Sequence, residues 1–118
     1  MSEATPSIDK QLVSALSEFG FDVERVPYTG KNKQYFAFNY ATIPMNHSDD
    51  EPEYEKYLIQ VHLYAPINVK LTSLVKQVKI ALHNAGFIYP DTTDASGADE
   101  KHIVFETENA EAIDYGTV

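Results

Sequence analysis

The 118-residue chain contains no cysteine, which excludes disulfide bonds, thiol catalysis and thiolate metal sites. Its five glycines are isolated from one another, so no glycine-rich loop is present to hold a nucleotide phosphate. The sequence also lacks the Gly-x-Ser-x-Gly motif that positions a serine nucleophile. We therefore expect no cofactor and no catalytic residues, and we expect that the protein is not an enzyme.

Long apolar runs are missing as well. No window approaches the roughly 20 apolar residues that a membrane-spanning helix needs. Residues 1–6 have neither the basic region nor the apolar core of a secretion signal. We expect a soluble protein that stays in the cytoplasm and binds no membrane.

Basic residues are scarce: 9 lysines and arginines stand against 18 acidic residues, and the formal charge is -9. Such a chain repels phosphate backbones, so we expect no tight binding to nucleic acid. The acidity has three interpretations: simple solubility, repulsion of DNA that passes nearby, or mimicry of a DNA duplex. The charge alone leaves all three open.

The pattern Ala-Leu-x-x-x-Gly-Phe is present twice, at residues 15–21 and 81–87. Each copy ends a run of helically spaced apolar residues with a glycine, which suits the left-handed position after a helix. An aromatic residue then begins an extended segment. The repeat predicts two helix-to-strand corners; a common capping requirement explains it, and internal duplication is the alternative.

Two helices follow from apolar residues at three- and four-residue spacing. We expect the first to begin at the N-cap Thr5, with Pro6 in its first turn, and to end at Gly20. The second begins at an N-cap that is either Thr72 or Ser73, and it ends at the second corner.

Strands are predicted where apolar and polar side chains alternate. The expected ranges are 21–28, 34–43, 57–65, 87–89 and 101–108. The second and third are long and consecutive, so we expect them to pair as an antiparallel hairpin. In the third strand, one row of side chains should face the helices: Tyr57, Ile59, Val61, Leu63 and Ala65.

These elements predict a single α+β domain over residues 1–118. Two helices pack on a mainly antiparallel sheet in the order α-β-β-β-α-β-β, with a long protruding hairpin. Residues 1–6 and 109–118 are expected to fray. Segments 44–55 and 90–101 are acidic and contain proline, which predicts exposed loops.

The polar residues suggest no metal site. Four histidines are present: His47, His62, His83 and His102. None are close in sequence, although His62 and His102 lie on predicted strands that could bring them together across the sheet. Residues 91–100 supply carboxylates without the ligand spacing of a calcium-binding EF-hand. We interpret the histidines as ordinary surface or half-buried residues and this segment as a solvated loop.

Tyrosines cluster on or beside the predicted hairpin. Tyrosine combines a large apolar ring with a polar tip, and it is enriched at protein interfaces. Aromatic residues on both hairpin faces fit a sheet covered by helices on one side and by either a partner subunit or solvent on the other. The interface candidates are Tyr35, Tyr40, Tyr57 and Tyr64, together with Asp49, Asp50, Glu51, Asp94 and Asp99 of the acidic loops.

Four features in a fixed order carry a resemblance to a known group. They are a helix ending Phe19-Gly20-Phe21, an aromatic hairpin with the arm 57–64, the helix 72–85 with its Ala85-Gly86-Phe87 exit, and an acidic loop before residues 102–106. Over residues 7–108 the chain resembles the small tail-terminator, tail-completion and head-tail joining proteins of long-tailed bacteriophages and prophages. The resemblance implies an α+β subunit that assembles into a ring, commonly of six copies.

The resemblance also implies partners and a location. The ring would stack on the tail tube and present a surface to the head connector, first in the host cytoplasm and then in the virion tail. Acidic residues that face its lumen would repel passing DNA. Loops 44–55 and 90–101 are expected to dock and become ordered on assembly.

Two other hypotheses stay open. An acidic DNA-mimic or inhibitor module, bound to a nucleic-acid-binding protein, would carry carboxylates over one face at phosphate-like spacing. A small enzyme or ligand-binding domain would have a deep pocket with converging polar side chains.

Overall fold

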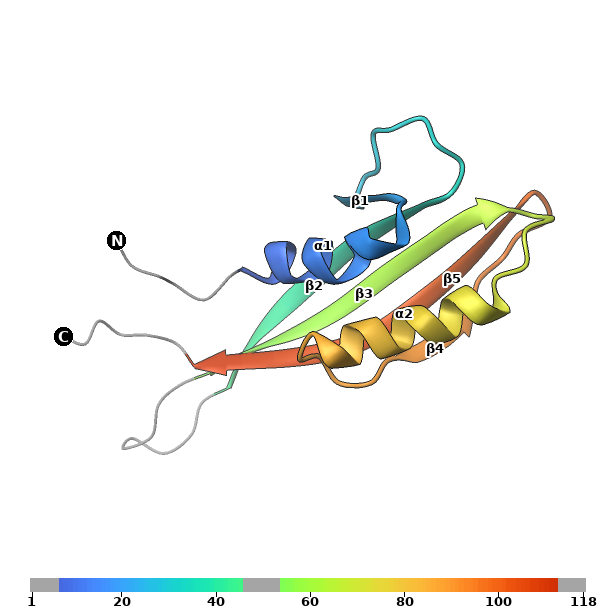
Figure 1. Cartoon of the computed structure of the whole chain (residues 1–118). Helices are drawn as coiled ribbons and strands as arrows, with labels where there is room; N and C mark the ends of the chain where they lie inside the picture. The colour runs from blue at the N-terminus through green and yellow to red at the C-terminus, as the bar shows by residue number, and fades with distance from the viewer. Residues whose placement is uncertain (1–6, 46–53, 113–118) are drawn as a thin grey trace.

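The structure of the protein, a computed structural model, describes residues 7–45 and 54–112 (Figure 1). Its elements in chain order are α1 (Ile8–Leu16), the 3-10 turn η1 (Ser17–Phe19), β1 (Asp22–Arg25), β2 (Tyr35–Met45), β3 (Tyr54–Pro66), α2 (Thr72–Asn84), β4 (Asp91–Asp94) and β5 (Glu100–Ala112). The class is α+β, and the order of helices and strands is the one that the sequence predicts.

The five strands form one mixed sheet in the order β1-β2-β3-β5-β4. The pair β1–β2 is parallel, and the other pairs are antiparallel. The expected hairpin is confirmed, with β2 and β3 in register from the pair Tyr35–Tyr64 to the pair Met45–Tyr54. Both arms extend beyond their expected ends, because Pro44 still pairs with Glu55.

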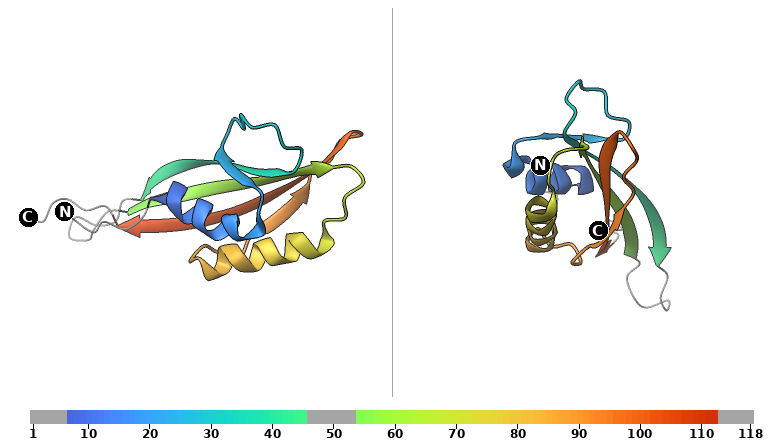
Figure 2. Two further views of the ribbon diagram at one scale, coloured as in Figure 1. Left: turned by 45° about the horizontal axis from the view of Figure 1, so that its top comes forward. Right: turned by 90° about the vertical axis from the view of Figure 1, so that its right-hand side faces the viewer.

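Both helices lie on one side of this sheet (Figure 2). Side chains alternate between the two faces of a strand, and cross-strand partners share a face. The register therefore gathers the alternate side chains of every strand on the side without helices, which we call the open face. The members of the open face are Asp22 and Glu24 of β1, Tyr35, Ala37, Asn39, Ala41 and Ile43 of β2, Lys56, Leu58, Gln60, His62 and Tyr64 of β3, His102, Val104, Glu106 and Glu108 of β5, and Asp91 and Thr93 of β4.

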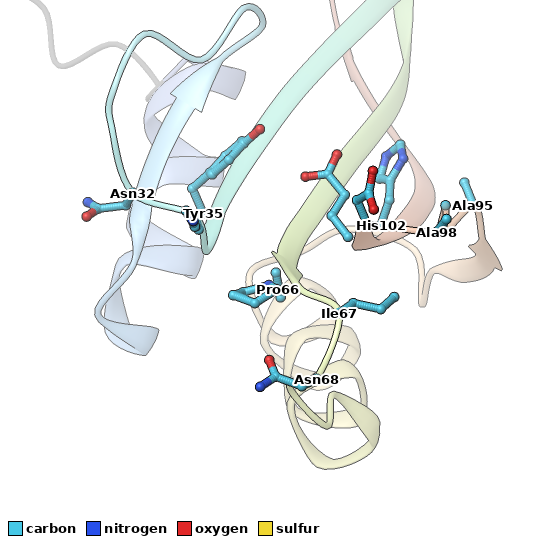
Figure 3. A pocket seen from close by; sticks show the side chains of 13 residues that line it. Asn32, Tyr35, Pro66, Ile67, Asn68, Ala95, Ala98 and His102 are labelled. Atoms are coloured by element: carbon cyan, nitrogen blue, oxygen red, sulfur yellow. The ribbon is translucent and has the colours of Figure 1, made fainter.

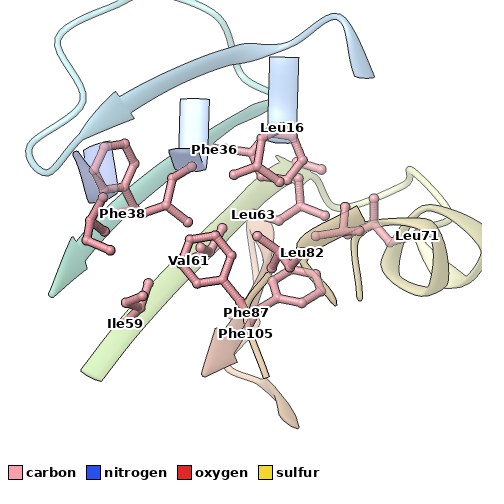
Figure 4. Packing of buried hydrophobic residues seen from close by; sticks show 14 residues of the cluster. Leu16, Phe36, Phe38, Ile59, Val61, Leu63, Leu71, Leu82, Phe87 and Phe105 are labelled. Atoms are coloured by element: carbon pink, nitrogen blue, oxygen red, sulfur yellow. The ribbon is translucent and has the colours of Figure 1, made fainter. Parts of the chain in front are cut away.

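The core fills the space between the sheet and the two helices (Figure 4). Its buried residues include Phe36 and Phe38 of β2, Ile59, Val61 and Leu63 of β3, Phe105 of β5, Leu12 and Leu16 of α1, Val78 and Leu82 of α2, and Phe87. The row of β3 side chains that was expected to face the helices does so. Truncation of one of the buried phenylalanines to alanine typically costs about 3–5 kcal/mol.

Both predicted corners are present, with positive φ at Gly20 (83°) and Gly86 (104°). At the end of α2, the Phe87 amide donates to the Leu82 carbonyl (3.1 Å) and the Gly86 amide donates to the His83 carbonyl (3.0 Å). This is the Schellman arrangement, which requires a left-handed residue after the helix. Phe87 is buried in the core, so the same turn both ends the helix and fixes it to the sheet.

The expected helix caps were wrong. Ser7, rather than Thr5, caps α1, because its hydroxyl accepts a hydrogen bond from the Lys10 amide (3.2 Å). Thr5 and Pro6 lie outside the described residues. The N-cap of α2 is Leu71, without a side-chain hydrogen bond. Thr72 and Ser73 are already inside the helix, where the Ser73 hydroxyl accepts from the Gln77 side chain (3.0 Å).

The expected strand at 87–89 was also wrong. Phe87 belongs to the corner, and the strand begins after Pro90 as β4. The expected loop 90–101 therefore contains β4 and the start of β5, and only residues 95–99 connect them. Residues 109–112 continue β5, where fraying was expected, while 113–118 lie outside the described residues. Neither described helix is long and apolar enough to cross a membrane.

We predict that Gly20→Ala and Gly86→Ala each lower the free energy of unfolding by about 1–2 kcal/mol, because alanine is strained in the left-handed region. Gly97→Ala is the matched control, since Gly97 has no positive φ and no atom within 4 Å of an added Cβ. Urea unfolding of the three variants measures the difference. Equal stabilities would contradict the capping role of the two corner glycines.

Candidate interaction surface

A crossover loop closes one end of the open face. Residues 26–34 connect the parallel strands β1 and β2 and carry Tyr28 onto the ring of Tyr35, with ring centroids 3.7 Å apart. The Tyr28 hydroxyl donates to the Asp22 carboxylate (2.6 Å) and accepts from the Asn32 amide (3.1 Å). A Cβ on Gly30 would lie 2.3 Å from the Tyr28 hydroxyl oxygen, so this loop conformation requires glycine.

Four rings continue across the sheet from this loop, and we call them the aromatic row: Tyr28, Tyr35, Tyr64 and His102. The ring centroids are 3.7 Å apart for Tyr28 and Tyr35, 4.9 Å for Tyr35 and Tyr64, and 4.2 Å for Tyr64 and His102. All three pairs are stacked. Each ring therefore covers the face of its neighbour. The row presents ring edges and hydroxyl groups at the surface, rather than free ring faces on which a nucleobase could stack.

A chain of hydrogen bonds, which we call the polar chain, lies beside the aromatic row. The Glu106 carboxylate only accepts, so the Gln60 side-chain nitrogen donates to it (3.0 Å). The Gln60 oxygen then accepts from the Asn39 amide (3.5 Å), and the Asn39 oxygen accepts from His62 Nε2 (2.9 Å). His62 Nδ1 is left to accept from His102 Nε2 (2.8 Å). The carboxylate thus fixes the tautomers of both neutral imidazoles.

Burial lowers the pKa of both histidines, and for His62 the neighbouring imidazole lowers it further. The carboxylates of Glu100 and Asp94 oppose this effect at His102. A proton on His102 Nδ1 leaves the polar chain intact, whereas a proton on His62 Nδ1 would point at the N–H of His102. The pair therefore accepts one proton, on His102, before the chain must break.

Burial also raises the pKa of the Tyr35 and Tyr64 hydroxyls, whereas at Tyr28 the hydrogen bond to Asp22 is the larger cause of a raised pKa. At Tyr64 burial is the larger cause and Glu100 adds to it. At Tyr35 burial is followed by the electrostatic effect of Tyr64 and of Glu100. Both hydroxyls therefore remain protonated hydrogen-bond donors over the range in which the histidines titrate.

The other half of the open face holds a shallow groove of about 540 Å³, which we call the acidic groove. Among its lining residues are apolar Leu58, Ile88 and Tyr89 and acidic Asp91, Glu106 and Glu108. Ile88 and Tyr89 are about half exposed, and Leu58 is 37% exposed. Lys56 pairs with Glu108 (3.0 Å) and is the only basic side chain that the described strands place on the open face.

A second groove, of about 910 Å³, lies at the end of the sheet that carries the aromatic row. Its walls come from three segments: Asn32 and Tyr35 beside the crossover loop, residues 66–68 after β3, and Ala95, Ala98 and His102 of the β4–β5 hairpin (Figure 3). Lys33, Asp99 and Glu100 bring charges of both signs to its lining.

The sequence-predicted tyrosines divide between the two faces. Tyr35 and Tyr64 lie on the open face, half-buried by each other. Tyr40 and Tyr57 lie on the helix side, with ring centroids 5.7 Å apart. The Tyr40 hydroxyl donates to Asp9 of α1 (2.5 Å), and this hydrogen bond raises the pKa of Tyr40.

The predicted acidic residues are not brought together by the described structure. Asp94 ends β4, and its carboxylate accepts from the Ser96 amide (2.9 Å). Hydrogen bonding with the Ser96 side chain, and then with its amide, lowers the pKa of Asp94. Asp99 is exposed in the loop between β4 and β5. Asp49, Asp50 and Glu51 lie outside the described residues. His47 does too, so its position relative to the other histidines is not described.

His62 and His102, which the sequence analysis placed on strands that could bring them together, are in contact. His83 lies on α2, where its Nδ1 contacts the Phe87 carbonyl (3.2 Å). Within residues 7–45 and 54–112, no three histidine or acidic side chains converge as a metal site. The sequence did not indicate the crossover loop or the aromatic row. The only signals were Gly30 and the tyrosines on either side of it, which many turns would also contain.

No protein-family model matches this chain, and no curated protein sequence matches it either. Thirteen chains among solved structures do match. One of them, whose printed name states no function, superposes with a TM-score of 0.56 at 14% sequence identity. The match covers 93% of this chain and 99% of the other. This likeness shows that the fold exists elsewhere, and it carries no information about activity.

We predict that His62 and His102 titrate below their ordinary value of about 6.5, with His62 the lower of the two. As the pH falls through that value, the unfolded chain takes up protons before the folded chain does. The free energy of unfolding therefore decreases between about pH 7 and pH 5.5.

Two-dimensional NMR of the imidazole groups measures the midpoints, and urea unfolding at each pH measures the slope. His62→Gln should flatten the slope, because it removes one of the two imidazoles whose pKa burial lowers in the folded chain. Midpoints at or above the ordinary value would contradict the neutral polar chain.

Proposed function

We propose that this chain is a structural assembly subunit that binds copies of itself through the open face. The observation that carries the proposal is a five-stranded sheet with helices on one side only. The other side combines half-buried aromatic rings with exposed Leu58 and Ile43. Uncovered apolar residues surrounded by polar ones are typical of protein interfaces.

The open face is also rigid enough to act as a docking surface. Its side chains are held by the stacking of the aromatic row and by the polar chain, both of which cross several strands. A surface that is ordered before binding loses less side-chain entropy when a partner covers it. The proposal assigns no catalytic role and no cofactor to the chain.

The specific role that we propose is that of a tail-terminator or head-tail joining subunit, as the sequence resemblance implies. In that role the copies form a ring, which in the resembled group commonly has six copies. The ring contacts the tail tube and the head connector. The net charge of -9 supports it, because an acidic lumen would not retain DNA. The chain would then work in the host cytoplasm and afterwards in the virion tail.

One observation favours the alternative of a DNA-mimic or inhibitor module. The open face carries carboxylates across several strands, including Glu24 of β1, Glu106 and Glu108 of β5, and Asp91 of β4. The two functions differ in what binds the face: a basic nucleic-acid-binding protein, which DNA would displace, or another copy of the chain.

We predict that the wild-type protein is oligomeric at tens of micromolar and that Leu58→Arg shifts it toward monomer, because a buried unpaired charge would oppose association. Val13→Arg is the matched control, since Val13 is similarly exposed (39%) but lies on α1. Light scattering and native mass spectrometry report the mass. A wild-type monomer throughout this range would contradict the proposal.

A further inference from the structure

Charge is unevenly distributed along the chain. Between Ile67 and Pro90 there is no acidic residue, whereas three of the nine basic residues lie there: Lys70, Lys76 and Lys79. This segment contains α2. Residues 25–48 likewise lack acidic residues and hold Arg25, Lys31 and Lys33, so α2 lies in one of two basic stretches of a strongly acidic protein.

The exposed side of α2 is a continuous strip of side chains at helical spacing. Its members, which we call the α2 strip, are Ser73, Lys76, Gln77, Ile80 and His83. Ile80 is 44% exposed, and Lys79 lies beside the strip with its ammonium 5.7 Å from the ring of Tyr89. The strip thus combines an exposed apolar residue with positive charge. A helix surface of this kind matches an acidic groove with an apolar floor.

The acidic groove has that complementary character. Leu58 and Ile88 supply apolar surface, and Asp91 and Glu106 face each other across the β4–β5 pair. Glu106 accepts one hydrogen bond, from Gln60, and Glu108 pairs with Lys56. Two carboxylates placed opposite each other on adjacent strands repel. A cation that approaches both would therefore reduce the electrostatic repulsion between them.

We infer that the α2 strip of one copy docks in the acidic groove of the next copy. This inference rests on the proposed function and specifies its interface. The strip belongs to a helix on the side of the sheet opposite the open face (Figure 2), and the two surfaces adjoin at Tyr89, which lines the groove and contacts Lys79 and His83 of α2. One copy therefore uses its helix side and its neighbour uses its open face.

Such a contact is heterologous where each copy binds one neighbour through its strip and another neighbour through its groove. Repetition of a heterologous contact forms a closed ring where the rotation between copies closes, and a filament where it does not. A two-fold dimer that paired the two grooves would bring the carboxylates of each groove against those of the other, so charge disfavours that arrangement. The same charge arrangement thus favours rings over paired open faces.

Charge reversal tests the contact. Lys76→Glu with Lys79→Glu makes the strip acidic, and Asp91→Lys with Glu106→Lys makes the groove basic. Each double variant alone should associate more than about tenfold more weakly than wild type, because like charges then meet. Lys10→Glu with Lys31→Glu is the matched control, with both lysines exposed away from the strip, and it should assemble as wild type does. Circular dichroism and urea unfolding confirm that each variant is folded.

A mixture of the two double variants should restore the wild-type mass, since each acidic strip meets a basic groove and each basic strip meets an acidic groove. The fourfold variant should restore it alone. An assembled wild type that neither reversal affects overturns the inference and leaves the proposed function standing. Weakened variants that neither mixing nor combination rescues also overturn it. A wild type that stays monomeric contradicts the proposed function itself.

Discussion

The two-residue period of the central strand β3 is the constraint on which the rest of the structure depends. This strand pairs with β2 on one side and β5 on the other, so its register decides which face each of their side chains occupies. Ile59, Val61 and Leu63 point into the helix-covered core, and Leu58, Gln60 and His62 necessarily point the other way. A one-residue shift in the register of β3 would place the side chain of His62 in the core and those of Ile59, Val61 and Leu63 in water.

The same alternation explains why the open face is ordered without a helix to cover it. Cross-strand neighbours are close enough for their side chains to interact directly. On this face the neighbours are stacked rings at one end and hydrogen-bonding side chains beside them, and the crossover loop adds Tyr28 to the stack. The face therefore has a defined shape in the free subunit, while its apolar residues near Leu58 remain accessible.

Local patterns allowed the hairpin, the helix-facing row and both glycine corners to be predicted, because each depends on residues that are neighbours in sequence or in period. The failures depend on contacts that the sequence does not display. The strand expected at 87–89 is one example, because Phe87 is drawn into the core and the strand begins only after Pro90. The aromatic row needs a loop that returns over the sheet, and the histidine contact needs the register of β3 with β5. The proximity of His62 and His102 could be suggested from the sequence. Their tautomers, in contrast, follow only from the carboxylate of Glu106.

The separation of charge gives the sheet two unlike sides. A protein with a net charge of -9 would keep its copies apart if the charge were spread evenly, since every approach would bring like charges together. Lys76 and Lys79 on α2 and carboxylates on the open face provide an orientation in which approach is attractive. That orientation joins helix side to open face and disfavours open face against open face. The overall acidity therefore opposes random aggregation, and its uneven distribution favours the contact between α2 and the open face that we propose.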